Sequence, residues 1–91
     1  MSAKVRIPTQ LRSLAGGAAE VEVQATTVGE ALKALDVSHP GFAERLFDDS
    51  GELRRFVNVF LGEEDVRFLE GLATAVPEGA VVSVVPAVAG G

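Results

Sequence analysis

The segment from Ala80 to Val85 is the feature that most constrains the fold of this chain. Four of its six residues are valines, it follows the turn-forming sequence Pro77-Glu78-Gly79, and Pro86 comes directly after it. A short run that is almost continuously β-branched is typical of a strand buried on both faces. We therefore expect a central strand here, buried on both sides and flanked by strands from earlier in the chain.

Two segments near the start alternate between polar and apolar residues. Residues 4–8 (KVRIP) and 20–24 (EVEVQ) have the period of two that is typical of a half-buried strand, and the proline ends the first. Residues 13–18 contain Gly16-Gly17 and predict a turn. The two strands should form a hairpin whose apolar side chains all face one core.

Residues 27–38 carry the signals of an amphipathic helix. Thr27 and Glu30 form a capping-box pattern, in which the Thr27 hydroxyl accepts from the N–H of Glu30 and the Glu30 carboxylate accepts from the N–H of Thr27. Apolar residues then recur at helical spacing: Val28, Ala31, Leu32 and Leu35. Residues 39–41 (HPG) end this helix, and residues 42–47 predict a second, shorter one.

The remaining elements lie between this helical region and the last strand. Residues 55–61 (RFVNVFL) are rich in β-branched and aromatic residues and predict a third strand. Residues 62–65 (GEED) predict a turn, and residues 66–68 (VRF) are a candidate short strand. The order of strand, strand, helix, strand, short elements and strand indicates an α+β fold.

The composition excludes several classes of function. The chain has 91 residues, a formal net charge of −5 and no cysteine. The lack of cysteine excludes disulfides, thiolate catalysis and cysteine-ligated metals, and the acidic charge argues against nucleic acid or anionic lipid as a partner. No segment has the pattern of a secretion signal or a membrane span, so we expect a cytoplasmic protein. A domain this small is a better candidate for a binding or carrier module than for an enzyme with a deep pocket.

The last six residues, PAVAGG, have little bulk to pack and no charge except the terminal carboxylate. Glycine lacks Cβ, so a chain that ends in two glycines can enter a narrow channel and approach another molecule closely. Pro86 fixes φ, which predicts a boundary between a folded domain, residues 1–86, and a flexible tail, residues 87–91. Two interpretations remain: a frayed end without a role, or an arm whose carboxylate is the functional group.

Three segments resemble the ubiquitin-like sulfur carriers, a family that includes the small subunit of molybdopterin synthase and the sulfur carrier of the thiamine pathway. They are residues 7–12 (IPTQLR), 55–68 (RFVNVFLGEEDVRF) and 71–91 (GLATAVPEGAVVSVVPAVAGG). The similarity is greatest to the carriers of the thiocarboxylate-dependent cysteine pathway. The molybdopterin subunit usually has two prolines where this chain has Pro86-Ala87, and the thiamine carrier usually lacks an insertion like residues 42–53.

This resemblance implies a fold and a role for the tail. The fold would be a ubiquitin-like β-grasp, with a mixed sheet of four to five strands packed on one main helix and the first and last strands parallel at its centre. In this family an E1-like adenylyltransferase uses ATP to adenylate the terminal carboxylate, here that of Gly91. A sulfur source then displaces AMP and leaves a thiocarboxylate. The preceding residues Ala87, Val88, Ala89 and Gly90 would enter the active site of the partner.

By the same resemblance, the chain is a carrier and not an enzyme: it supplies no catalytic residue, no metal ligand and no bound cofactor. A second enzyme would accept the sulfur for cysteine biosynthesis, with molybdopterin, thiamine or a thiosugar as alternatives. A protein modifier whose Gly91 is joined to lysines is a further alternative, and so is a plain interaction domain with an idle tail. We expect the carrier to be a monomer when alone.

Three residues of the predicted third strand are candidates for docking a partner. If Val57, Val59 and Leu61 face the helix, then Phe56, Asn58 and Phe60 face the other side of the sheet. Exposed aromatic residues there would mark an interaction surface. The alternative is that a loop covers Phe60.

Overall fold

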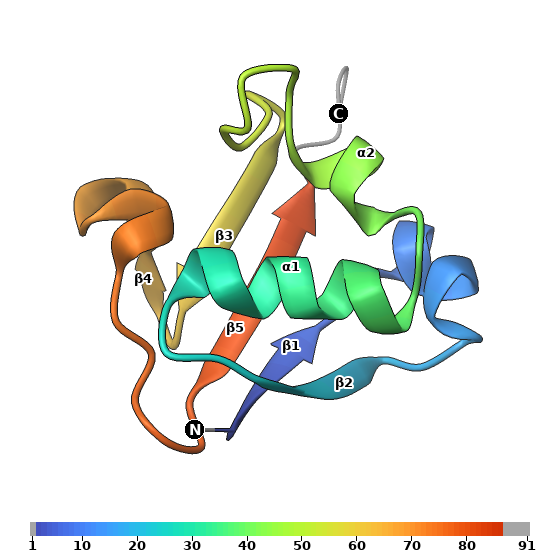
Figure 1. Cartoon of the computed structure of the whole chain (residues 1–91), viewed down its shortest axis with the longest axis horizontal. Helices are drawn as coiled ribbons and strands as arrows, with labels where there is room; N and C mark the ends of the chain where they lie inside the picture. Colours follow the sequence, from blue (N-terminus) through green and yellow to red (C-terminus); the bar gives the residue numbers. More distant parts are fainter. Residues whose placement is uncertain (1, 87–91) are drawn as a thin grey trace.

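The computed structural model describes residues 2–86, which form a five-stranded mixed sheet with the main helix across one face (Figure 1). The strands are β1 (Ser2–Arg6), β2 (Glu20–Gln24), β3 (Val57–Leu61), β4 (Glu64–Asp65) and β5 (Val81–Pro86). The helices are α1 (Val28–Ser38) and α2 (Phe42–Leu46), with three 3-10 segments, η1 (Thr9–Ala15), η2 (Val66–Phe68) and η3 (Gly71–Ala73).

The last strand lies at the centre of the sheet, as its valines predict. The strand order is β2-β1-β5-β3-β4, with β5 parallel to β1 and antiparallel to β3. Figure 1 shows β5 (red) between β3 (yellow) and β1 (blue). In the register Val82 lies beside Val5, and Val84 lies beside Val59. Apolar side chains of three strands therefore meet on one face.

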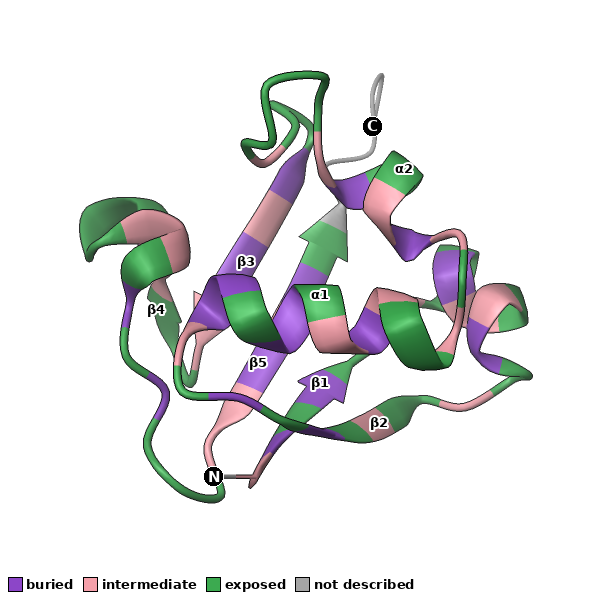
Figure 2. Cartoon of the chain, in the orientation of Figure 1, coloured by how far each residue is buried: buried purple, intermediate pink, exposed green. Residues whose placement is uncertain are grey.

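The core lies between that face and α1. The four residues of the predicted helical stripe, Val28, Ala31, Leu32 and Leu35, are all 0% exposed. Figure 2 shows buried and exposed positions recurring along α1, which lies across the sheet. Burial of these aliphatic side chains is the main favourable contribution to folding in a domain with so few aromatic residues.

The N-terminus of α1 is capped as predicted on one side only. The Thr27 hydroxyl accepts from the backbone N–H of Glu30 at 3.2 Å. The Glu30 carboxylate, predicted to bond to Thr27, instead accepts from the backbone N–H and the hydroxyl of Thr26, at 2.8 and 2.7 Å. These hydrogen bonds, that of the Thr26 N–H first, lower the pKa of Glu30.

A second polar contact ties the start of β1 to the turn before β5. The Glu78 carboxylate accepts from the Ser2 backbone N–H at 2.9 Å and from the Ser2 hydroxyl at 2.7 Å. The backbone N–H of Gly79 donates to the carbonyl of Ser2 at 2.8 Å. The two parallel strands thus begin side by side.

The prediction that β5 is buried on both faces is wrong. Val82 and Val84 are buried, but Val85 is 45% exposed. The reason is that α1 covers one face of the sheet, while β5 presents Val81, Ser83 and Val85 on the other. Near-continuous valines therefore indicate the central position of this strand correctly and its burial incorrectly.

Three further local predictions need correction. Residues 66–68 form the 3-10 segment η2 instead of a strand, and the short strand β4 lies in residues predicted to be a turn. Residues 9–15 form η1, so the predicted turn is confined to the two glycines that follow it. Within residues 2–86 there is no helix with the length and apolar character to cross a membrane.

Candidate functional site

The predicted functional end of the chain, Gly91 with Ala87, Val88, Ala89 and Gly90, lies outside the described residues. The structure does fix the point from which it extends. β5 ends at Pro86, which lies opposite Val57 at the start of β3. The base of the tail, Pro86, therefore belongs to the central strand of the sheet and pairs with β3.

The side of the sheet away from α1 borders this point, and we call it the open face. The strand registers place on it the residues that alternate with the buried ones: Lys4, Arg6, Glu20, Glu22, Gln24, Asn58, Phe60, Val81, Ser83 and Val85. One row across it runs from Arg6 through Ser83 to Phe60, and Asn58 lies beside Val85. The open face is thus charged over β1 and β2 and more apolar over β5 and β3.

The three predicted docking residues lie at or beside the open face. Asn58 and Phe60 belong to it and are half-buried, whereas Phe56 lies in the turn before β3 and is 63% exposed. None of the three is part of the buried core. Phe60 is therefore neither fully open, as one expectation had it, nor fully covered, as the other did.

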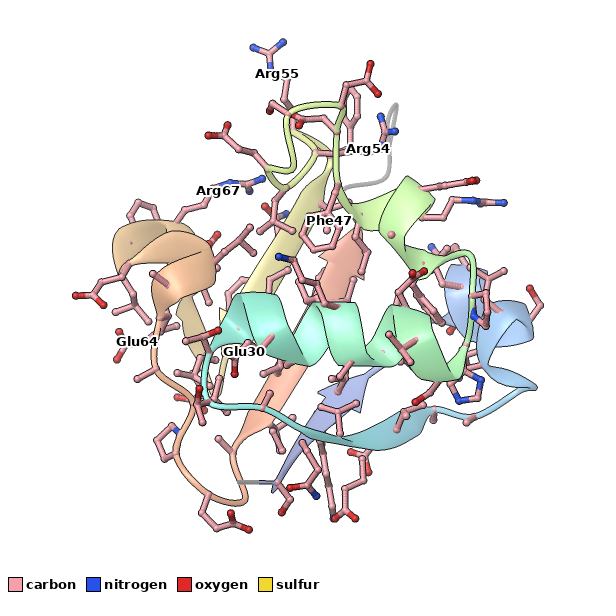
Figure 3. The ribbon with its side chains drawn as sticks, viewed as in Figure 1. Glu30, Phe47, Arg54, Arg55, Glu64 and Arg67 are labelled. Atoms are coloured by element: carbon pink, nitrogen blue, oxygen red, sulfur yellow. The ribbon has the colours of Figure 1, made fainter. Side chains whose placement is uncertain are left out.

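Arg67 organises the edge of this region, and sequence reasoning missed it. Its Nη1 donates to Asn58 Oδ1 at 2.7 Å, and its Nη2 donates to the carbonyls of Val57 at 2.8 Å and Arg54 at 3.0 Å. Figure 3 shows the Arg67 side chain reaching from the 3-10 region toward the start of β3. A planar guanidinium suits this role because its donors point in fixed directions at several acceptors.

Two apolar side chains beside Arg67 are exposed and were also missed. Phe68 is 85% exposed and Leu69 is 40% exposed. The Asp65 carboxylate accepts from the backbone N–H of Arg67 at 2.8 Å, which caps η2 and fixes the local backbone. The sequence signal for this cap was Asp65 itself, since aspartate before a short helical turn is a common cap. It was missed because residues 66–68 were predicted to be a short strand.

Further arginines lie at the same end of the sheet as the base of the tail. In Figure 3 Arg54 and Arg55 lie at the loop that leads into β3, near the carboxyl end of β5. Arg54 Nε donates to the carbonyl of Glu44 at 3.0 Å. In the same loop the Asp48 carboxylate accepts from the Ser50 hydroxyl, which is the main reason its pKa is lowered. Among the described residues no group of three or more histidine, aspartate or glutamate side chains could hold a metal ion.

The parallel first and last strands, the hairpin and the single main helix across one face define a ubiquitin-like β-grasp domain. The model of the ThiS family matches residues 5–91, and the chain belongs to this family. The resemblance seen in the sequence and the fold expected from it are both confirmed.

Individual relatives span the whole chain. The sulfur carrier protein CysO of Mycobacterium tuberculosis is 46% identical over 93 residues and covers all of both chains. A chain in the crystal structure of the BexX/CysO complex of Amycolatopsis orientalis matches with a TM-score of 0.92 and 42% identity, over 98% of this chain and 99% of that one. Small archaeal modifier protein 3 of Haloferax volcanii is 46% identical over 65 residues, which is 71% of this chain and 70% of the relative.

Proposed function

We propose that this chain is a sulfur carrier whose terminal Gly91 is converted to a thiocarboxylate. The observation that carries the proposal is the full-length similarity to a protein named as a sulfur carrier, together with a family match that includes the diglycine end. The position of Pro86, at the end of the central strand, supports it. A reactive group on an extension of the central strand can enter another protein while the folded domain stays intact.

The chemistry of the proposal requires partner enzymes. The carboxylate of Gly91 attacks the α-phosphorus of ATP, forming an acyl adenylate and releasing pyrophosphate. A sulfide ion then attacks the acyl carbon, and AMP leaves with the electron pair of the broken C–O bond, which gives the thiocarboxylate; a persulfide donor would first form an acyl disulfide, which a thiol must reduce to release the thiocarboxylate. An E1-like adenylyltransferase would catalyse the first step, so ATP is bound by the partner and the carrier itself needs no cofactor.

The proposed acceptor is an enzyme of cysteine biosynthesis, because CysO proteins are among the relatives that span the whole chain, at 46% identity. Supply of sulfur to molybdopterin, thiamine or a thiosugar uses the same thiocarboxylate and is the alternative destination. The complex of a CysO with BexX in Amycolatopsis orientalis supports the idea that such carriers bind an acceptor or activating enzyme directly. We place the protein in the cytoplasm, where ATP is available, as a monomer between transfers.

A second candidate function is a ubiquitin-like protein modifier. The similarity to small archaeal modifier protein 3 favours it, although this match covers 71% of the chain. Both functions begin with adenylation of Gly91, so they differ only in what the activated carbonyl meets next: a sulfur atom or a lysine amine.

Mass spectrometry of the intact protein isolated from its own cells tests the proposal. A thiocarboxylate adds about 16 Da, the difference between sulfur and oxygen. Recovery of this species from the wild type, and its absence from a variant that lacks Gly91, is the expected result. Isopeptide-linked conjugates without any thiocarboxylate would replace the carrier function with the modifier function.

A further inference from the structure

A groove of about 690 Å³ lies where β1 and β5 end, beside the base of the tail. Its polar wall is made of side chains from the hairpin, η1 and β5: Arg6, Thr9, Gln10, Arg12, Glu20 and Ser83. Val85 adds an apolar side chain next to them. Because Arg6, Ser83 and Val85 also belong to the open face, the groove and the open face form one continuous surface.

The two arginines of the groove have donors to spare. A guanidinium carries five N–H donors. Arg6 uses its Nε on the Glu20 carboxylate at 3.2 Å, and Arg12 uses its Nε on the carbonyl of Ile7 at 3.0 Å. Among residues 2–86 neither side chain has another acceptor, so the Nη groups of both can bind a ligand. The two existing contacts orient the guanidinium groups, which reduces the entropy lost on binding.

The charge of the groove differs in sign from that of the rest of the molecule. Two arginines and one glutamate give the groove a net charge of +1, so the remainder of the chain carries −6. An acidic segment of another protein would be repelled by most of this surface and attracted here. Charge complementarity of this kind orients an encounter and excludes wrong orientations.

The length of the tail limits how far from the groove a partner can bind. Only five residues follow Pro86, and each extends the chain by about 3.5 Å at most, so Gly91 can lie no more than about 18 Å from Pro86. Val85, the residue before Pro86, lines the groove. Any enzyme that acts on the carboxylate of Gly91 must therefore bring its active site within about 18 Å of Pro86, which places its surface close to the groove.

We propose that the groove receives an aspartate or glutamate side chain from the enzyme that adenylates Gly91, held by the Nη groups of Arg6 and Arg12. This inference rests on the proposed function. The activating enzyme is the partner that must bind first, because a free carboxylate does not accept sulfur until it is activated. A protein segment also fits better than a small free anion, since the groove continues into the apolar residues of the open face.

The test is a comparison of carrier variants in the ATP–pyrophosphate exchange reaction of the adenylyltransferase. Arg6→Gln removes the charge but keeps an amide that can donate to Glu20, and Lys33→Gln is the matched control. Lys33 is exposed on α1, on the other side of the sheet, and its substitution changes the net charge equally. Thermal unfolding of both variants checks that the fold is retained.

We expect Arg6→Gln to raise the KM for the carrier about fivefold or more, and Lys33→Gln to leave it within about twofold. We also expect the wild-type KM to rise more steeply than that of Arg6→Gln between about 50 and 300 mM NaCl. Salt screens the attraction between Arg6 and the acidic side chain of the enzyme, and the Arg6→Gln variant no longer has this attraction. Equal KM values for the two variants, or a loss confined to kcat, would overturn the inference.

An NMR titration distinguishes the source of the anion. A hexaglutamate peptide should shift the amide signals of Arg6, Arg12 and Ser83, and inorganic phosphate at the same concentration should shift them less. Equal or larger shifts with phosphate would contradict an acidic protein segment and indicate a small-anion site. Failure of the proposed function is recognised separately, because wild-type carrier would then form no thiocarboxylate at all.

Discussion

The hydrogen bond between Arg67 and Asn58 joins η2, at the edge of the sheet, to β3, the strand that pairs with the end of β5. The Nη1 of Arg67 donates to Asn58 Oδ1 at 2.7 Å, and Asn58 lies opposite Val85 in the register. The same guanidinium bonds to two backbone carbonyls at the start of β3. One side chain therefore links η2, the loop before β3 and the open face through hydrogen bonds.

Removal of these contacts should destabilise the domain measurably. We expect Arg67→Gln to lower the free energy of unfolding by about 1–3 kcal/mol, because a charged donor to three acceptors is lost at a partly exposed site. Arg67→Lys should restore less than half of this loss, since an ammonium group cannot reach three acceptors in fixed directions. Urea unfolding measures both; full rescue by lysine would show that the charge matters and the hydrogen-bond geometry does not.

The predicted docking aromatics should behave differently from a core aromatic. Phe56→Ala is expected to change the free energy of unfolding by less than about 0.5 kcal/mol, as for other surface substitutions, yet to weaken binding to the adenylyltransferase. Phe42, which is 1% exposed, is the control, and its truncation to alanine should cost about 3–5 kcal/mol. Phe60→Ala should cost less than Phe42→Ala, because Phe60 is half-buried and outside the core.

The outcome that contradicts this assignment is specific. If Phe56→Ala and Phe60→Ala bind the adenylyltransferase with wild-type affinity while folded, the open face is not the docking surface. Calorimetry of the complex, with circular dichroism as the check on folding, gives both quantities.

We expect Gly91 to be the residue of the carrier that is essential for activation. Deletion of Gly91, or addition of one alanine after it, is expected to abolish ATP–pyrophosphate exchange, because the deletion leaves the carboxylate short of the α-phosphorus and the addition moves it past that atom. The melting temperature should stay close to that of the wild type, since the buried residues of the described part lie between Ala3 and Val84. Normal exchange by the deletion variant would argue against the carboxylate of Gly91 as the reacting group.

Acid should weaken the contact between β1 and the turn before β5. The Ser2 hydroxyl and backbone N–H donate to Glu78 and lower its pKa below the usual 4.5. A carboxyl group with a lowered pKa in the folded state stabilises that state above its usual pKa, and the contribution is lost as the pH falls from about 4.5 through the lowered value. Glu78→Gln should therefore be less stable than the wild type at pH 7, and the difference should shrink near pH 3.

Urea midpoints at the two pH values measure this difference. Glu63→Gln is the control for the change in net charge, because the Glu63 side chain is exposed, in the turn between β3 and β4. A difference between Glu78→Gln and the wild type that is the same at both pH values would mean that the contact with Ser2 contributes no pH dependence.

Periodicity was sufficient for the elements that build the core. The alternation in residues 20–24 predicted β2 with its observed bounds, and the 3.6-residue stripe predicted α1 because its four apolar positions all had to be buried together. The valine run placed β5 at the centre. Its exposed side could not be predicted, because that depends on which face the helix covers and valine is compatible with either.

The region around Arg67 could not be predicted for a different reason. Residues 66–68 are apolar, basic and aromatic in turn, a pattern that fits a strand as well as a 3-10 segment. The bonds from Arg67 to Asn58, Val57 and Arg54 join residues nine to thirteen positions apart, and no local pattern encodes them. The groove likewise depends on β1 and β5 becoming neighbours, although Arg6 and Ser83 are far apart in sequence.

The parallel pairing of β1 with β5 has a practical consequence for handling the protein. Ser2 lies beside the turn before β5, whereas Pro86 lies at the other end of that strand. Six residues of strand separate the two points by roughly 20 Å. A fluorophore, affinity tag or surface linker attached ahead of Ser2 is therefore anchored at the opposite end of β5 from Pro86, after which the proposed reactive tail begins. Immobilised in this way, the domain would present its tail outward to any enzyme in solution.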